Sequence, residues 1–295
     1  MATTFGQLID RVRYSLRSYT GQHEVSTHLT ADATEGAVDL SVADGNAVAT
    51  GLVEIEDELV WVDSSAGGVL TVPPYGRGYQ GSTAAAHLSG KQVITDPFFP
   101  RKHIADAIVD TQRALYPTLF QPKAKEFTFT AGQSTYDLDS DVDRVLSVSW
   151  QLPGSSEFWT PVRRWRTDTF ANTTEFASGS NITVFDPIGP DRTVRAVYAA
   201  PFTELTVASD TIGAAGHQEA HVDLLVFGAC WRLLQFLEVS RLNLNSVENA
   251  ERAKFAASGS ASALTRQVLA LYERRLEEER KRLLQLYPIT IRYTR

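Results

Sequence analysis

Residues 51–93 constrain the fold more than any other part of the chain, because short apolar runs follow one another there with turn residues between them. Val53 and Ile55 alternate with Glu54 and Glu56, which is the period of a strand with one buried face. Turn signals separate this run from further apolar runs at 59–62, 69–72 and 92–94. The pattern predicts one small β module, with the acids of 54–58 as solvated charges at a hairpin tip.

The glycines between Gly76 and Gly81 match the spacing of a dinucleotide-binding fingerprint. That chemistry needs a buried strand before the glycines, a helix after them and an acid about 20 residues further on. Here two prolines precede the glycines, and the first acid downstream is Asp96, next to another proline. We therefore predict a structural loop without a cofactor, in which His87 pins the loop and Glu58 anchors it. Its residues are Glu58, Arg77, Gly78, Gly81, His87 and Gly90.

The chain has 295 residues and a net charge of −7, so it has room for two or three compact units. The acidic balance argues against a protein that grips nucleic acid by its phosphates. The single cysteine, Cys230, excludes an intramolecular disulfide, and its apolar surroundings favour a packed thiol over a nucleophile. The sequence shows no signal peptide and no apolar run of membrane length, so we expect a soluble protein made in the cytoplasm.

Apolar stripes at helical spacing predict four main helices, at about 3–18, 101–120, 217–239 and 262–286. Strand patterns return between the second and the third helix, and again after Pro288. These features predict an α+β fold: a helical bundle of four main helices with two inserted β units and an extended C-terminal tail. The expected parts are the N-terminal helix 1–22, the β module 23–97, the second bundle helix 98–122, the second β unit 123–210, the C-terminal bundle helices 211–287 and a docking tail 288–295.

Residue sets that carry chemistry are sparse in the sequence. His217 and His221 have the spacing of two metal ligands on one helix face, but a zinc protease helix needs its Glu directly after the first His. Two partly exposed histidines at a helix start explain the pair more simply. No Gly-x-Ser-x-Gly elbow is present either. We therefore predict no catalytic residue, no cofactor and no metal site, and hence no enzyme.

The segment 51–93 resembles a β module that recurs in neck and tail proteins of long-tailed DNA bacteriophages. That module reads apolar–D/N–E–apolar–x–V and then R-G-x-x-G-T-x-A-x-x-H-x-x-G-x-x-V, and Ser82 here stands in place of the Thr. The positions that fit are Glu58, Arg77, Gly78, Gly81, Ala84, His87, Gly90 and Val93. In the order of its helices and β parts, the whole chain is similar to the head-to-tail adaptor (connector) proteins of these phages.

The resemblance implies a structural virion protein of the phage neck without catalytic residues. It implies a ring of about twelve copies under the portal, which joins head to tail and extends the DNA channel. The expected partners are other copies, the portal protein, the next neck or tail protein and passing double-stranded DNA that is not bound specifically. We expect assembly in the host cytoplasm and no membrane partner. The alternative is a carbohydrate- or receptor-binding tail module, with an aromatic platform at Trp150, Phe158, Trp159 and Trp165.

Two further sets of residues are expected at protein contacts. The alternating tail can add a strand to the portal or to a neighbouring subunit, through Ile289, Ile291, Arg292, Tyr293 and Arg295. A short basic patch around Trp165 suits either nucleic-acid binding or a strand whose arginines meet carboxylates. We favour the second interpretation and predict a contact between subunits at Arg163, Arg164 and Arg166. Because acids exceed bases by 35 to 28, the wall of a DNA channel should be neutral or acidic.

Overall fold

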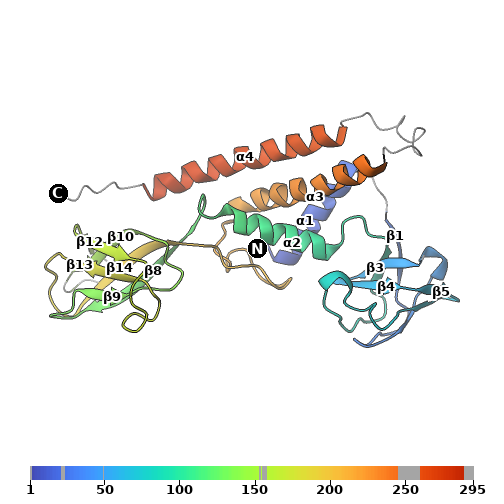
Figure 1. The fold of residues 1–295 in the computed structure, drawn as a ribbon, viewed down its shortest axis with the longest axis horizontal. Helices are drawn as coiled ribbons and strands as arrows, with labels where there is room; N and C mark the ends of the chain where they lie inside the picture. Colours follow the sequence, from blue (N-terminus) through green and yellow to red (C-terminus); the bar gives the residue numbers. More distant parts are fainter. Residues whose placement is uncertain are drawn as a thin grey trace. The chain divides into compact units, whose positions relative to one another are not determined.

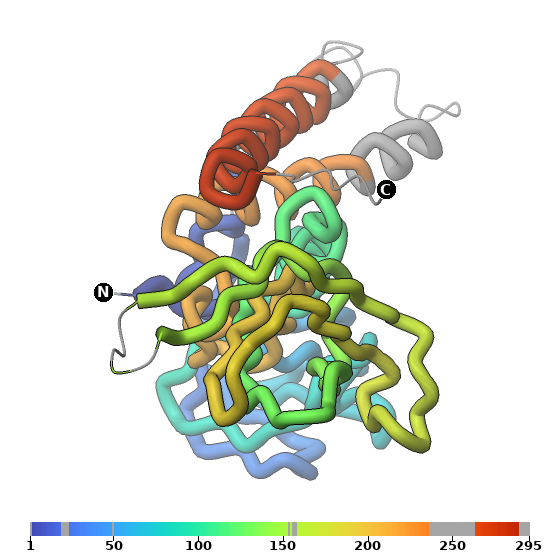
Figure 2. The backbone as a smooth tube through the Cα atoms, turned by 90° about the vertical axis from the view of Figure 1, so that its left-hand side faces the viewer, coloured from blue at the N-terminus to red at the C-terminus, as the bar shows by residue number. Residues whose placement is uncertain are grey.

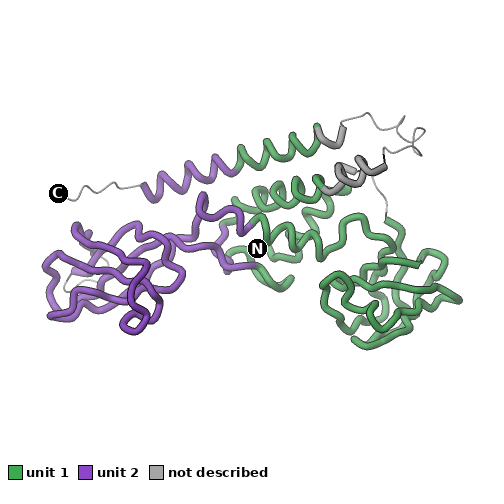
Figure 3. The backbone as a smooth tube through the Cα atoms, in the orientation of Figure 1, with its two compact units in different colours: residues 1–111, 205–213, 218–275 green, residues 112–204, 214–217, 276–295 purple. Residues whose placement is uncertain are grey.

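The computed structural model describes residues 2–20, 24–48, 50–152, 154, 158–244 and 260–288. The chain forms two compact units, coloured separately in Figure 3. Unit 1 comprises 1–111, 205–213 and 218–275, and unit 2 comprises 112–204, 214–217 and 276–295. The predicted tail contact at 289–295 lies outside the described residues.

The β module of unit 1 consists of two small antiparallel sheets around one core. The four-stranded sheet has the order β1-β7-β3-β4 and the three-stranded sheet the order β2-β6-β5. Alternate residues of both sheets, such as Val53, Val60 and Leu70, enter the core and are fully buried. The strands are β1 (Val25–His28), β2 (Asp39–Ser41), β3 (Gly51–Ile55), β4 (Glu58–Val62), β5 (Ser64–Ala66), β6 (Val69–Thr71) and β7 (Gln92–Thr95).

The helical part of unit 1 lies beside the module (Figure 1). Helix α1 (Phe5–Thr20) presents one apolar stripe, from Phe5 to Leu16, to the interior. Gly228 lets helices approach closely, because a Cβ atom there would lie 2.2 Å from Thr111 and 3.0 Å from Tyr272. These residues belong to α2 (Arg101–Leu115), α3 (Val222–Leu244) and α4 (Ser260–Leu286). The described residues also include three short 3-10 helices, η1 (Gly45–Ala47), η2 (Tyr79–Gly81) and η3 (Glu219–His221).

The β part of unit 2 is built from two antiparallel sheets, drawn in green to yellow in Figures 1 and 2. Their orders are β11-β10-β14-β8 and β12-β13-β9. Both sheets contribute to one core, in which Val148 and Tyr198 of the first meet Tyr136 and Ile182 of the second. The strands are β8 (Gln121–Phe129), β9 (Thr135–Asp137), β10 (Arg144–Gln151), β11 (Trp159–Pro161), β12 (Trp165–Asp168), β13 (Asn181–Val184) and β14 (Arg192–Ala200).

The expected helical bundle with inserted β units is wrong. In the described part of the chain, fourteen strands in four sheets stand beside four α-helices. Each β part also has a hydrophobic core of its own, so the fold is β-rich. The error has a physical reason. Strands of three residues, such as β5, β9 and β11, are too short to produce an alternating pattern in the sequence.

Candidate functional site

Glu58 is the centre of the polar network that holds the glycine-rich loop. It begins β4, and a tight reversal through Glu56, which has φ 54°, connects it to β3. Its carboxylate is 1% exposed and accepts hydrogen bonds from side chains and backbone alike. The donors are Arg77 Nε (2.7 Å), Arg77 Nη2 (2.9 Å), Gly78 N (3.0 Å), Ala85 N (3.1 Å) and His87 Nε2 (2.7 Å).

Arg77 ties the loop to the rest of the module. Its guanidinium forms a bidentate pair with Glu58 and donates to the carbonyl of Ala85 at 2.5 Å. The remaining nitrogen, Nη1, donates to the carbonyls of Thr34 at 2.7 Å and Ala37 at 3.1 Å. The planar fork of an arginine can serve an acid and several carbonyls at once, which lysine cannot do. Arg77 therefore links β4, its own loop and the β1–β2 connection.

The surroundings of His87 favour its imidazolium form. Its Nδ1 lies 2.9 Å from Glu56 Oε2 and its Nε2 lies 2.7 Å from Glu58 Oε2. Both partners are carboxylates, and only the doubly protonated ring donates from both nitrogens. The hydrogen bond to Glu58 is the main cause that raises the pKa of His87, against burial, which lowers it; Glu56 adds to the rise. Backbone bonds of 2.8 Å in each direction between His87 and Ala33 fix the ring's position.

Glu58 and His87 shift each other's pKa values. Burial alone raises the pKa of Glu58, but the hydrogen bonds from His87, Arg77 and the backbone outweigh it and lower that pKa to about 2. Glu56 has a lowered pKa because bonds from Lys91 and His87 likewise outweigh its burial. The network is therefore an ion cluster in which each charge has an opposite charge within hydrogen-bond distance. Such a cluster fixes a loop, and its acidic and basic side chains are already paired with one another.

The glycines of the loop lie where the backbone turns. Gly78 has φ 60°, and a Cβ atom there would lie 3.0 Å from the carbonyl oxygen of Ser82 and 3.1 Å from Ala84 N. Gly81 and Gly90 also have positive φ, 78° and 87°. The structure thus brings Glu58, Arg77, Gly78 and His87 together, while these two glycines shape turns beside them.

The acids of the hairpin are not all solvated, so that expectation is wrong for Glu54, while Glu58 takes the anchoring position in the loop. Glu58 is buried in the loop network, and Glu54 is 2% exposed on the opposite side of the hairpin. Glu54 accepts from Arg13 Nη1 of α1 at 2.5 Å and from the backbone N of Arg101, the first residue of α2, at 2.8 Å. An acid at this position also stabilises the positive end of the helix dipole. Burial raises the pKa of Glu54, although Arg13 and Arg101 act against the rise.

Sequence reasoning missed this second network of Glu54. Arg101 extends it, with Nε 2.8 Å from Asp57 and with an ion pair to Asp10 of α1. Strand alternation placed Glu54 on the polar face, and the sequence does not say that helices cover that face. The one available signal is Arg13, which directly follows the buried Val12 of the α1 stripe and is itself only 8% exposed.

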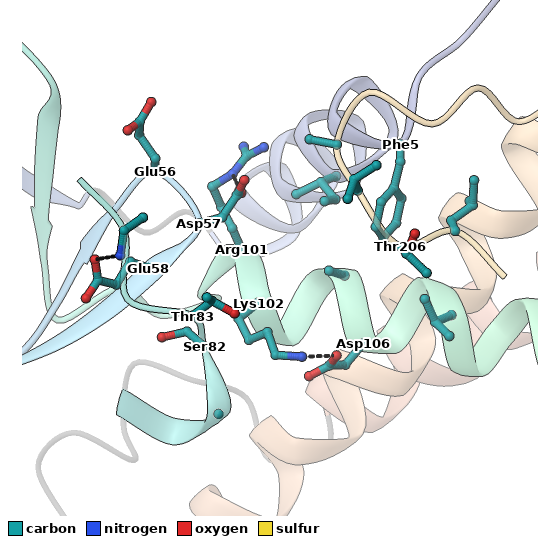
Figure 4. Close-up of a pocket in the computed structure, with 18 of the residues that line it drawn as sticks. Phe5, Glu56, Asp57, Glu58, Ser82, Thr83, Arg101, Lys102, Asp106 and Thr206 are labelled. Carbon is teal, nitrogen blue, oxygen red and sulfur yellow. Dashed lines mark hydrogen bonds and ion pairs between the residues drawn. The ribbon is translucent and has the colours of Figure 1, made fainter. Parts of the chain in front are cut away.

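A cavity of about 660 Å³ adjoins both networks within unit 1 (Figure 4). Figure 4 shows the hairpin and the loop, with Glu58 and Ser82, on one side and α2, with Lys102 and Asp106, on the other. The charged residues of its wall pair with each other, as Lys102 does with Asp106 at 2.5 Å. The cavity therefore separates the module from α2 without gathering free acids and bases at one point.

The predicted subunit-contact residues lie on unit 2 and are exposed. Arg164 Nε pairs with Asp186 at 3.1 Å, and Asp186 also accepts from the backbone N of Arg163 at 2.6 Å. Arg166 lies on β12, an edge strand of its sheet. A carboxylate of the same chain thus meets part of this patch.

The two histidines at the start of α3 do not form a helical pair. His217 stacks on Phe202, with ring centroids 4.0 Å apart, and η3 separates it from α3. Both histidines are buried, so the expectation of partly exposed side chains is wrong. Among the described residues, no three potential metal-binding side chains are grouped around a common point. Burial raises the pKa of the Cys230 thiol to about 12, which keeps it un-ionised.

The aromatic residues of the alternative function do not share one surface. Trp150 and Trp165 pack against the core of unit 2. Phe158 is 65% exposed, while Trp159 is covered on one ring face by the guanidinium of Arg195, 3.9 Å from the ring centroid. The core thus uses two of the four rings that a glycan platform would need.

Comparison with known protein families shows which family the chain belongs to. The family model of the SU10 adaptor protein matches residues 82–282, more than half of the chain. The match begins inside the glycine-rich loop and continues through both units to α4. No curated protein matches the chain by sequence. None of the described helices combines the length and apolar character of a membrane span. The chain belongs to the SU10 adaptor protein family and is a structural adaptor of the phage virion.

Proposed function

We propose that this protein forms a closed ring in the phage neck, under the portal, where it joins head to tail and extends the DNA channel. The observation that carries the proposal is the family match over residues 82–282. The resemblance of segment 51–93 to the neck and tail module supports it independently, because most of that segment precedes the matched region.

The build of the chain suits repeated contacts between unlike surfaces. Each β part leaves edge strands open in the described residues, among them β8 and β12 in unit 2. Open edges accept strands from other chains. Rings close when one surface of a subunit meets a different surface of the next. The exposed patch of Arg163, Arg164 and Arg166 fits such a contact, with carboxylates of the neighbouring copy as partners.

The loop network supports a mechanical role for the β module. The charges of Glu58, Arg77 and His87 are paired with one another, and this pairing holds the loop in one conformation. The net charge of −7 suits a wall along which DNA slides, because a neutral or acidic surface does not hold phosphates. The partners in this proposal are other copies, the portal and the next neck or tail protein.

The tail provides a direct test. We propose that Ile289, Ile291 and Tyr293 form the apolar side of a strand that docks on the portal or on a neighbouring subunit, helped by Arg292 and Arg295. Deleting 288–295 should leave a folded protein that no longer joins filled heads, and Ile291→Asp should have the same effect. Thr290→Ala, on the other side of the alternating pattern, is the matched control. Infectious tailed particles from the deleted protein would contradict the proposal.

A further inference from the structure

Strand β8 has an open edge along its whole length. Its nine residues, Gln121–Phe129, all pair with β14 on one side, and β8 is the last strand of its sheet. No other described backbone group bonds to the opposite side of residues 122–128. An open edge of this length is a template for an additional strand.

The half-buried side of β8 carries partly covered apolar surface at its C-terminal end. The residues of β8 alternate between half-buried and exposed, and the half-buried set includes Phe127 and Phe129. These two rings pack against the core of unit 2 without being enclosed by it. At the start of the strand, Gln121 Oε1 is buried and accepts no hydrogen bond from the described part of the chain.

The chain itself supplies a candidate at the right place. Helix α4 ends at Leu286, and the ring of Tyr287 contacts that of Phe120, with centroids 6.3 Å apart. Phe120 directly precedes β8. The last described residues therefore leave α4 beside the first residue of the open edge, and both belong to unit 2.

The remaining sequence has the length and the pattern of a strand for this edge. Residues 289–295 would span about 23 Å when extended, against about 30 Å for β8. Ile289, Ile291 and Tyr293 alternate with polar residues. In a strand that starts beside Gln121 and runs parallel to β8, these three side chains lie on the half-buried side of the sheet, beside Gln121, Lys123 and Lys125. The end of the added strand then reaches Phe127.

We infer that β8 binds the C-terminal segment 289–295 of its own chain as an added parallel strand. The free protein then holds the tail on unit 2, and docking on a partner requires the tail to leave β8. The release of the tail to a partner rests on the proposed function, whereas the pairing of the tail with β8 does not. The partner must therefore offer a better edge than β8.

Disulfide trapping in the full-length protein tests the pairing. Ala124 is exposed on β8, so Ala124→Cys is combined in turn with Thr290→Cys, Arg292→Cys or Thr294→Cys. Neighbouring strands bring Cα atoms to about 5 Å, within reach of a disulfide. The matched control places the β cysteine at Ser147, which lies in the same cross-strand row and is also exposed. From there a strand added to β8 is about 14 Å away.

We expect at least one Ala124 pair to form a disulfide within the monomer about tenfold faster than the matching Ser147 pair, because the pairing raises the effective concentration of the two thiols. Equal rates for the two series, or disulfides that only join two chains, would overturn the inference. The deletion of 288–295 in virion assembly tests the proposed function separately, so either idea can fail alone.

Discussion

Replacing Glu58 by Gln removes the charge at the centre of the loop network while keeping the size of the side chain. The carboxylate receives five hydrogen bonds, three of them from Arg77 and His87. A glutamine offers one oxygen and turns an NH₂ group toward the remaining donors. Arg77, whose side chain is 9% exposed, then stays buried without its counter-charge.

The expected loss is several kcal/mol. Removing one partner of a buried ion pair costs about 3–5 kcal/mol. The pKa of Glu58 gives a similar figure, because its change from the ordinary 4.5 to about 2 corresponds to about 3 kcal/mol of folding free energy. A folded-state pKa that is lowered contributes stability above pH 4.5. That contribution disappears as the pH falls from 4.5 toward 2.

Native-state hydrogen exchange measures the effect where it occurs. In peptides that cover 58–62 and 77–90, amides whose exchange requires opening of the module should exchange about two to four orders of magnitude faster in Glu58→Gln. The matched control is Glu56→Gln on the same hairpin, whose side chain is 41% exposed and should cost less than about 1 kcal/mol. If both variants exchange alike, or if Glu58→Gln exchanges like the wild type, the network does not hold the loop.

Three further predictions concern pH, packing and assembly. Because the pKa of His87 is raised, its contribution to module stability should be complete below pH 6.5 and disappear at higher pH. The hydrogen-exchange protection factors of the wild type should therefore decline as the pH rises, and those of His87→Gln should not show this decline. Gly228→Leu should lower the melting temperature by overpacking a helix contact, at a cost of at least about 1–3 kcal/mol, whereas Gly36→Ala, with open space around it, should not. Replacing Arg163, Arg164 and Arg166 by alanine should weaken ring formation, which a sizing column measures. The DNA affinity of this variant, measured by a gel shift at low salt, should remain negligible.

The sequence was informative where local chemistry decides the structure. The stripe from Phe5 to Leu16 predicted α1, and the helix expected at 101–120 is observed as Arg101–Leu115. The strands around Val145, Ile182 and Val194 also lie where alternation places them. In each case the signal comes from several residues of one element, so remote contacts have little influence on it.

The sequence was misleading where a remote element covers a surface. Glu54 occupies a polar position of its strand, yet α1 and α2 bury it with Arg13 and the first amide of α2. The sequence of strand β1 shows no alternating pattern, and the strand forms because it pairs with the distant β7. The same holds for the fold class. Short strands gain their stability from partners far along the chain, so a sequence pattern favours the long helices and understates the sheets.

Electron microscopy of the purified protein, alone and mixed with the portal protein, shows directly whether the chain assembles into a neck ring. We predict closed rings of about twelve copies that stack on the portal, with a central channel wide enough for double-stranded DNA. Particles that stay monomeric under both conditions and do not bind the portal would show that the protein is not a ring-forming neck adaptor.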